Sequence, residues 1–156
     1  MEHDQLTELR RNLRRLERML TIQQDGCCTK VTLAQCHTLL EMEQSGPTTT
    51  TGALSEALSL DKSTLSRTID QLVKSGHISR KIDPKDRRYT ILKLTKKGRA
   101  ECDSINATAN RQYGEIFSTI PEADQGEIAK SLSQFLQALT HYYMHHDILE
   151  CDCREN

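Results

Sequence analysis

The sequence predicts a mainly α-helical fold with one small β-hairpin. Apolar residues recur at steps of three and four along most of the chain, which is the spacing of amphipathic helices. Between residues 78 and 95 this pattern gives way to two short runs around a proline-containing turn, which predict two strands. Tryptophan is absent and aromatic residues make up only 4%, so the core must come from leucine, isoleucine, alanine and methionine. With 156 residues the chain is long enough for one domain that buries such a core.

The first predicted helix covers residues 5 to 23 and has two contrasting faces. Its apolar face carries Leu6, Leu9, Leu13, Leu16, Met19 and Leu20. Its other face carries Arg10, Arg11, Arg14, Arg15 and Arg18. The run from Asp25 to Thr29 interrupts the pattern and predicts a loop.

The second predicted helix begins near Thr32, a residue suited to the N-cap, and ends at the run Ser45-Gly46-Pro47. The four threonines at 48–51 are β-branched and predict a short extended segment. That segment leads into a third helix, which is predicted to begin near Gly52.

The fourth predicted helix begins after Asp61, a natural N-cap, and ends at Gly76, which can adopt the left-handed conformation of a helix C-terminus. Its inner side carries an apolar stripe of Leu65, Ile69, Leu72 and Val73. Its remaining surface is polar and carries Ser63, Thr64, Ser66, Arg67, Asp70, Gln71 and Lys74.

The two predicted strands are joined through residues 83–86, where Pro84 presets a turn. Helical periodicity returns from Lys96, and Pro121 restarts a last helix, which is followed by a short acidic tail after Leu149. The first and last helices have broad apolar stripes without an obvious partner in so small a module. They are therefore predicted to pack against each other and against a second copy of the chain.

The charge of the chain is concentrated in the middle. Residues 61–99 carry 12 basic and 4 acidic side chains, a net charge of +8, whereas the preceding and following segments are acidic. Cations thus gather where a helix small enough for the major groove of DNA is followed by an arginine-tipped ribbon narrow enough for the minor groove. This combination predicts a DNA-reading unit. A winged helix used only for protein contact would not need such an excess of positive charge.

Two motifs carry a resemblance to a known family. The run 83–88, Asp-Pro-Lys-Asp-Arg-Arg, with the run 92–98, resembles the wing signature of the MarR family of winged helix-turn-helix transcriptional regulators. The run 61–67, with Leu72 and Gly76, resembles the recognition helix of that family. The resemblance covers about residues 5 to 145. It implies a homodimer on a pseudopalindromic operator and repression of transcription until a small effector or oxidant arrives.

The resemblance implies a single domain over residues 1–156. Residues 5–46 and 96–145 would supply the dimerisation helices, residues 48–95 the winged helix-turn-helix lobe, and residues 146–156 a cysteine-containing tail.

The side chains predicted to contact DNA lie in the helix that follows Asp61 and in the wing. Arg67 can donate two hydrogen bonds to a guanine edge, and Lys62 and Lys74 suit phosphate contacts. By resemblance, Arg88 enters the minor groove, braced by Asp86. The full predicted set is Lys62, Ser63, Thr64, Ser66, Arg67, Gln71, Lys74, Asp86, Arg87 and Arg88. For the serines and threonines, Ser66 among them, a capping or merely solvent-facing role is the alternative.

The six cysteines do not have zinc-finger spacing, since the chain has no pair of CxxC units. The pairs Cys27-Cys28 and Cys151-x-Cys153 are hypothesised to form an effector site for a soft metal ion, an arsenical or an oxidant. Cys36 and Cys102 fall within apolar-patterned helices and are predicted to lie in the core. His141 and His145, four residues apart, share a helix face with the spacing of two-histidine ligand pairs.

An organic effector, or none, is the alternative to a thiol-reactive one. By family expectation, an organic ligand would lie near His37 and Met42. His77 is predicted to be structural.

Other function classes find no support in the sequence. No CxxC redox pair, serine–histidine–acid arrangement or glycine-rich phosphate loop is present, so neither an enzyme nor a required cofactor is expected. No run approaches the ~20 apolar residues of a membrane span, and residues 1–5 lack the features of a signal peptide, so we expect a cytoplasmic protein without a membrane partner. The competing class is a thiol-based metal-handling protein that does not bind DNA.

Overall fold

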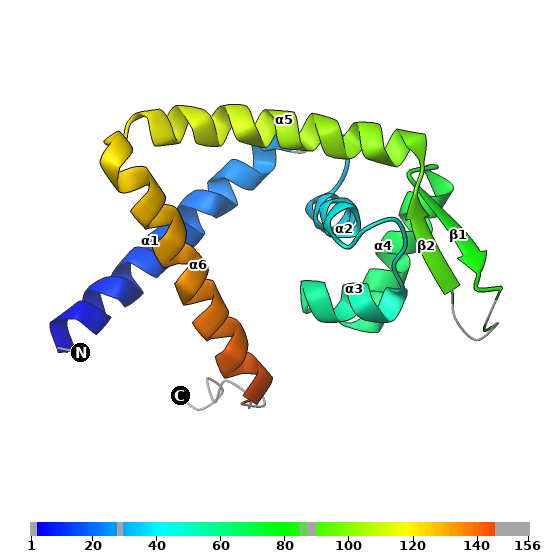
Figure 1. The fold of residues 1–156 in the computed structure, drawn as a ribbon, viewed down its shortest axis with the longest axis horizontal. Helices are drawn as coiled ribbons and strands as arrows, with labels where there is room; N and C mark the ends of the chain where they lie inside the picture. Colours follow the sequence, from blue (N-terminus) through cyan, green and yellow to red (C-terminus); the bar gives the residue numbers. More distant parts are fainter. Residues whose placement is uncertain (1–2, 28–29, 85, 87–89, 146–156) are drawn as a thin grey trace. The chain divides into compact units, whose positions relative to one another are not determined.

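The protein is mainly helical with a single β-hairpin (Figure 1). The structure, a computed structural model, describes residues 3–27, 30–84, 86 and 90–145. Over these residues the elements are α1 (His3–Cys27), α2 (Leu33–Gln44), α3 (Thr51–Leu58), α4 (Lys62–Lys74), β1 (Ile78–Ile82), β2 (Thr90–Leu94), α5 (Lys96–Ser118) and α6 (Glu122–His145). The predicted fold class is therefore confirmed. Contacts divide the chain into two compact units, residues 1–110 and 111–156.

Local capping signals fix where the central helices begin. Thr32 and Gln35 form a reciprocal capping box at α2, in which the Gln35 side chain accepts from the Thr32 N–H at 3.0 Å. Asp61 caps α4 by accepting a hydrogen bond from the Thr64 N–H at 2.8 Å. Both predicted N-caps are thus confirmed. Helix α3 begins at Thr51 with Thr50 as its N-cap, one residue earlier than predicted.

The prediction of a loop at residues 25–29 is wrong for residues 25–27. Helix α1 continues through Asp25 and Gly26 to Cys27, whereas Cys28 and Thr29 lie outside the described residues. A glycine in a helix interior costs only about 1 kcal/mol relative to alanine, and no proline interrupts this segment. Gly26 therefore weakens the helix without ending it.

The two strands pair antiparallel, with a register that runs from Ile78 opposite Leu94 to Ile82 opposite Thr90. Thr49 adds a short third edge to this hairpin. Its N–H donates to the Leu92 carbonyl at 3.1 Å, and its carbonyl accepts from the Leu92 N–H at 2.8 Å. The extended segment predicted before α3 therefore becomes part of the sheet. Strand β1 ends at Ile82 and β2 begins at Thr90, and Lys85 of the predicted turn lies outside the described residues.

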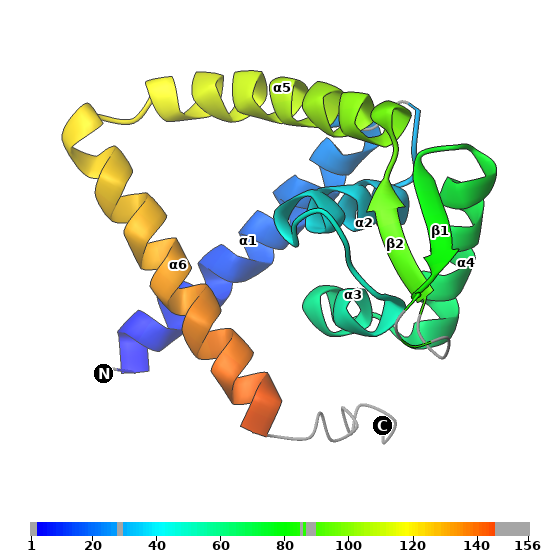
Figure 2. The same cartoon turned by 45° about the vertical axis from the view of Figure 1, so that its right-hand side comes forward.

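The core lies in the first unit, where α2, α3 and α4 pack together beside the hairpin (Figures 1 and 2). Its fully buried side chains include Leu39, Met42, Leu54, Leu65, Ile69, Leu72, Ile78, Leu92 and Cys102. The apolar stripe predicted for α4 supplies three of these residues. Cys36 is buried as well, so the prediction that Cys36 and Cys102 lie in the core is confirmed.

A tight junction joins the end of α4 to the start of α5. Gly76 has φ +78°, which confirms the left-handed helix end, and the buried His77 that follows has its Nδ1 2.7 Å from the Ser75 hydroxyl. The His77 carbonyl accepts from the Thr95 N–H at 3.0 Å. A Cβ atom built on Gly98 would lie 2.2 Å from the same carbonyl. The backbone of α5 therefore sits against residue 77 at a distance that only glycine permits.

Helices α1 and α6 differ from the central helices because none of their described side chains is fully buried. In the second unit, the Gln125 side chain holds the turn between α5 and α6 by donating to the carbonyls of Phe117 and Ile120 at 3.0 and 2.9 Å. Within the described residues, no helix combines the length and the apolar character that crossing a bilayer requires.

Candidate nucleic-acid interface

Helix α4 presents a polar, exposed face opposite its buried stripe. All seven α4 residues predicted to contact DNA are exposed: Lys62, Ser63, Thr64, Ser66, Arg67, Gln71 and Lys74. Four residues of the same helix, Leu65, Thr68, Ile69 and Leu72, face the core. The burial of one stripe thus fixes which face is available to a partner, and that face carries the predicted residues.

The N-terminal end of α4 is organised around Asp61. Besides capping the helix, its carboxylate accepts a hydrogen bond from the Ser63 hydroxyl at 2.6 Å. This hydroxyl and the groups of Thr64 hold the pKa of Asp61 well below its usual range, so the cap is charged at neutral pH. The Ser63 hydroxyl therefore donates its hydrogen to Asp61, and its oxygen can only accept a hydrogen bond from a partner.

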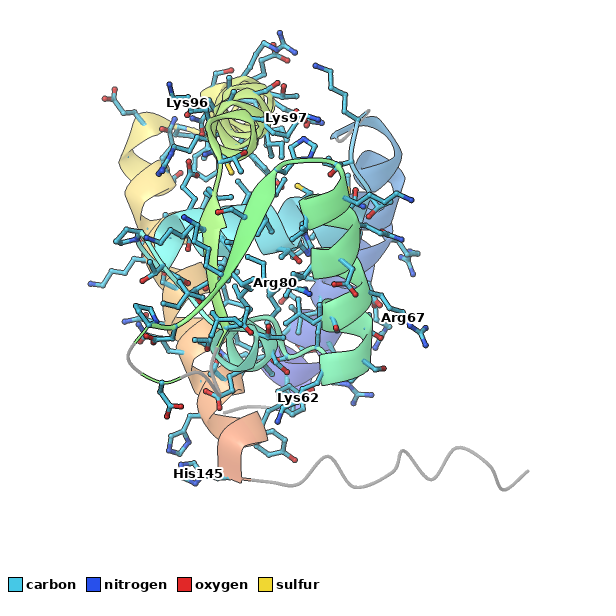
Figure 3. The ribbon with its side chains drawn as sticks, turned by 90° about the vertical axis from the view of Figure 1, so that its right-hand side faces the viewer. Lys62, Arg67, Arg80, Lys96, Lys97 and His145 are labelled. Atoms are coloured by element: carbon cyan, nitrogen blue, oxygen red, sulfur yellow. The ribbon has the colours of Figure 1, made fainter. Side chains whose placement is uncertain are left out.

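Arg67 projects outward from α4 (Figure 3). Its side chain is exposed, and no carboxylate within the described part of the chain forms an ion pair with it. A guanidinium on the exposed face of a helix can form the two parallel hydrogen bonds that a guanine edge or a phosphate accepts. The structure thus leaves Arg67 available to a partner.

Asp70 joins α4 to the hairpin. Its Oδ1 atom lies 2.7 Å from Nη2 of Arg80 on β1, and the two side chains are 59% and 40% exposed, respectively. Arg80 lies on the same side of the unit as α4 (Figure 3). The sequence analysis did not single out Arg80, because nothing in its local pattern shows that strand β1 passes beside Asp70.

Gln71 is joined to α2 by a side-chain hydrogen bond. Its Oε1 accepts from Nε2 of Gln35 at 3.0 Å, while Oε1 of Gln35 accepts from the Thr32 N–H. This chain of hydrogen bonds orients the Gln71 amide so that its NH₂ group remains free to donate. Gln35 is a second positioning residue that the sequence analysis missed, since the two glutamines are 36 positions apart.

The wing is described only in part. Asp86 is partly buried, and the predicted contacts Arg87 and Arg88 lie outside the described residues. The strands beside the connection carry four exposed basic side chains: Arg80, Lys81, Lys93 and, just after β2, Lys96. The next lysine, Lys97, has a structural partner, because its Nζ donates to the Ser75 carbonyl at 2.7 Å.

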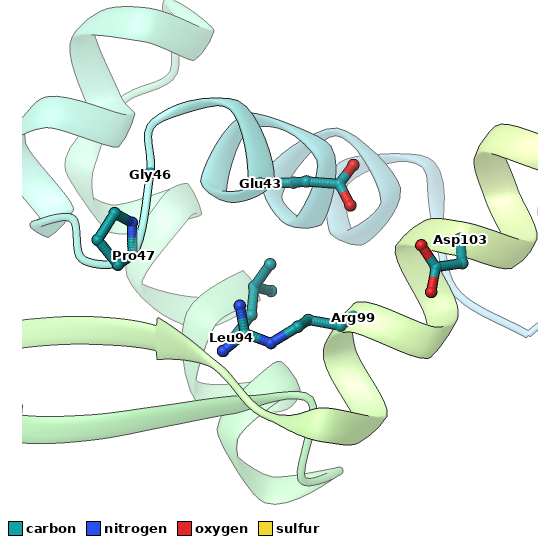
Figure 4. Close-up of a pocket in the computed structure, with 6 residues that line it drawn as sticks. All are labelled: Glu43, Gly46, Pro47, Leu94, Arg99 and Asp103. Carbon is teal, nitrogen blue, oxygen red and sulfur yellow. The ribbon is translucent and has the colours of Figure 1, made fainter.

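A pocket of about 380 Å³ opens between the end of α2, the end of β2 and the start of α5 (Figure 4). Glu43, Gly46, Pro47, Leu94, Arg99 and Asp103 line it. Arg99 provides its positive charge, and Glu43 is engaged by the Asn106 side chain at 2.8 Å. His37 and Met42, near which an organic ligand was predicted to lie, do not line this pocket, and Met42 is buried in the core.

The cysteines separate into two groups. Burial, reinforced by the Glu43 carboxylate, raises the pKa of Cys102 to about 11, so its thiol stays protonated at neutral pH and is a poor nucleophile. Of the hypothesised effector site, Cys28, Cys151 and Cys153 lie outside the described residues, and Cys27 ends α1 rather than lying in the predicted loop. Within the described residues, no three histidine, cysteine or acidic side chains cluster as a metal site would require.

The chain is similar in sequence and in fold to known proteins. The model of the MarR family matches residues 31–90, the segment that contains α2, α3, α4 and the hairpin. Over this segment the chain is similar to the MarR family. Its fold is the winged helix of MarR transcription regulators, with α4 in the position of the recognition helix and β1–β2 in that of the wing.

Several solved structures share the fold over most of the chain. FabT from Streptococcus pneumoniae, solved in complex with DNA, is 21% identical with a TM-score of 0.73, and the match covers 90% of this chain and 99% of FabT. A mutant MarR from E. coli, solved with operator DNA, is 25% identical with a TM-score of 0.65, over 80% of this chain and 94% of that protein. YusO from Bacillus subtilis is 23% identical with a TM-score of 0.65, over 88% and 99% of the two chains.

Proposed function

We propose that this protein is a MarR-type transcriptional regulator that binds double-stranded DNA through α4 and the wing, as a homodimer on a pseudopalindromic operator, and acts as an effector-responsive repressor without catalytic activity. The observation that carries the proposal is the exposed cationic face of α4, on which Arg67 forms no ion pair with any described carboxylate, and the basic hairpin beside it. The solved DNA complexes of FabT and MarR, which share this fold, support it.

The DNA proposal is tested by fluorescence anisotropy on duplexes from the neighbourhood of the gene, titrated over a range of salt concentrations. The logarithm of the affinity should fall linearly with the logarithm of the salt concentration, because each phosphate contact releases counterions. Arg67→Ala should weaken specific binding by ~1–3 kcal/mol, about the value of one good base contact.

Arg99→Ala is the matched control for Arg67→Ala. It removes the same charge from the same basic segment, but from the pocket on α5 instead of the face of α4. Equal losses from the two variants would show that α4 has no special role. Absence of any DNA binding at low salt, together with stoichiometric metal binding, would favour a metal-handling protein instead.

The homodimer is supported by apolar side chains that α1 and α6 leave exposed. On α1 these are Leu6, Leu9, Leu16 and Met19. On α6 they are Ile128, Leu132, Leu136 and Leu139. A second copy of the chain would cover these stripes and gain about 25 cal/mol for each Å² of apolar surface removed from water. One chain has a mass of 17.8 kDa, and light scattering after size exclusion should give twice that mass. Leu132→Glu should shift the measured mass towards that of the monomer.

The proposed effector response works through Cys27, Cys28, Cys151 and Cys153. It is supported by the burial of Cys36 and Cys102, which makes these two thiols poor candidates for an effector site. A soft metal ion, an arsenical or an oxidant that binds them should release DNA. Cys151→Ser combined with Cys153→Ser should preserve DNA affinity and abolish that release. A normal response in this double variant would refute the tail site.

The pocket beside Arg99 favours a second class of effector, a small organic anion. The Arg99 guanidinium can pair with the acid group of an aromatic ligand beside the apolar wall of Leu94 and Pro47, and Asn106 already engages one of the two lining carboxylates, that of Glu43. Arg99→Ala should then abolish DNA release by phenolic acids but not by arsenite, whereas the double cysteine variant should show the reverse pattern.

A further inference from the structure

A chain of side-chain amides joins α2 to the exposed face of α4. Oε1 of the half-buried Gln35 accepts from the Thr32 N–H at 3.0 Å, and its Nε2 donates to Oε1 of the exposed Gln71 at 3.0 Å. Gln71 lies four residues after Arg67, so these two side chains share one face of the helix. The amide chain therefore ends at the face that is proposed to meet DNA.

The Thr32 N–H fixes the direction of both hydrogen bonds. A backbone N–H can only donate, so the Gln35 atom beside it must be the amide oxygen, and the NH₂ group of Gln35 must face Gln71. Two NH₂ groups cannot bond to each other, so Gln71 must turn its own oxygen towards Gln35. Neither amide can rotate by half a turn without placing a donor opposite a donor and losing a hydrogen bond.

The end of Gln71 that remains for a partner is therefore a hydrogen-bond donor. Among the described residues, both hydrogens of its NH₂ group are uncommitted, whereas its oxygen already accepts from Gln35 and retains one lone pair. In the major groove, guanine presents two neighbouring acceptors, N7 and O6, whereas adenine presents the acceptor N7 beside the N6 donor. A glutamine that reads adenine directs its oxygen and its NH₂ group to the base together. The hydrogen bond from Gln35 opposes that arrangement.

We propose that Gln35 determines the base preference of Gln71: it holds the Gln71 amide as a donor and so favours guanine over adenine at the base pair that Gln71 meets. The proposal deepens the proposed function and rests on DNA binding through α4. Gln35 is a positioning residue, because both ends of its amide are engaged by Thr32 and Gln71 and it acts on the base through Gln71.

The test exchanges the donor at position 35 for an acceptor with Gln35→Glu. A glutamate there keeps the capping box, because its carboxylate can still accept from the Thr32 N–H. Its second oxygen can only accept, so the Gln71 amide should rotate, donate its NH₂ group to residue 35 and present its oxygen to the base. Gln44→Glu adds the same charge at an exposed position of the same helix and is the matched control.

The operator is first selected from random duplexes with the unmodified protein, and affinities are then measured by fluorescence anisotropy for every base pair at every position. Gln71→Ala should flatten the preference at one base pair, which identifies the pair that Gln71 meets. There the unmodified protein should favour guanine over adenine by at least about fivefold, and Gln35→Glu should lower this ratio by at least about fivefold. The ratio cancels any uniform loss of affinity caused by the added charge, and Gln44→Glu should leave it unchanged.

An unchanged ratio in Gln35→Glu would overturn the proposal, as would an equal change in Gln44→Glu, which would assign the effect to charge alone. A preference for adenine at the Gln71-dependent base pair, or the absence of any such base pair, would overturn it as well. In each of these cases the unmodified protein still binds DNA, so the proposed function survives. Absence of DNA binding by the unmodified protein would refute both, and the two failures are therefore distinguishable.

Discussion

Replacing Gly98 with alanine should destabilise the protein, although alanine favours helices. In an ordinary helix interior this substitution stabilises by ~0.5–1 kcal/mol, because alanine has less backbone entropy to lose. At Gly98 the new Cβ would meet the His77 carbonyl oxygen at 2.2 Å and the carbonyl carbon at 3.1 Å. These are backbone atoms held by hydrogen bonds from Thr95, so they cannot rotate away.

The close contact should outweigh the helix preference. Because the clashing atoms belong to the backbone, overpacking should cost the upper part of its usual range, ~2–3 kcal/mol, and subtracting a helix gain of ~0.5–1 kcal/mol leaves a net loss of about 1–2.5 kcal/mol of unfolding free energy. For a chain of this size each kcal/mol lowers Tm by roughly 2–4 °C, so Tm should fall by about 2–10 °C. Urea denaturation followed by circular dichroism, at one fixed protein concentration, measures the change.

Gly114 provides a matched control in the same helix. A Cβ there meets nothing within 4 Å, so Gly114→Ala should raise stability by ~0.5–1 kcal/mol. Gly126 on α6 is equally open and should respond in the same direction. If Gly98→Ala stabilised the protein as much as Gly114→Ala, the argument that residue 98 is sterically confined would be refuted.

Further predictions concern His77, the Asp70–Arg80 pair and the wing. Burial lowers the pKa of His77 below its ordinary 6.5, helped by the charge of Lys97 and opposed by that of Glu101. Because the unfolded chain then binds a proton more readily than the folded one, the free energy of unfolding should keep its full value above pH 6.5 and fall as the pH drops below it. His77→Gln should flatten this dependence in urea melts between neutral and mildly acidic pH. Asp70→Ala should cost no more than ~1 kcal/mol, because the ion pair is half exposed, and high salt should erase the difference; a larger, salt-independent cost would contradict this. Arg88→Ala should weaken operator binding by ~1–3 kcal/mol without changing the mass of the oligomer in light scattering, and unchanged affinity would remove the predicted role of the wing.

Much of the central unit is predictable from sequence because its signals are local. An N-cap such as Asp61 and a helix end such as Gly76 depend on residues within one turn. The apolar stripe of α4 repeats at helical spacing, so both its buried side and its free side follow from the periodicity alone. The same logic identified the exposed face on which the predicted DNA contacts lie.

The interactions that position this face were not predictable because they join distant residues. Arg80 meets Asp70 only after β1 has folded back beside α4, and Gln35 meets Gln71 only after α2 has packed on it. The bridge between Thr49 and Leu92 has the same origin. The error at Gly26 has another cause: a glycine is a frequent helix stop, yet its cost is small enough for neighbouring turns to override.

The Asp70–Arg80 pair connects the two elements that are proposed to meet two different grooves of one duplex. This pair, together with the packing of α4 against β1, couples the helix to the ribbon, so the two adjust to DNA of unusual width or twist as one body. We therefore expect the protein to discriminate among duplexes by their shape and stiffness, even at base pairs that no side chain touches. Spacer substitutions that leave every contacted base intact should accordingly change the affinity.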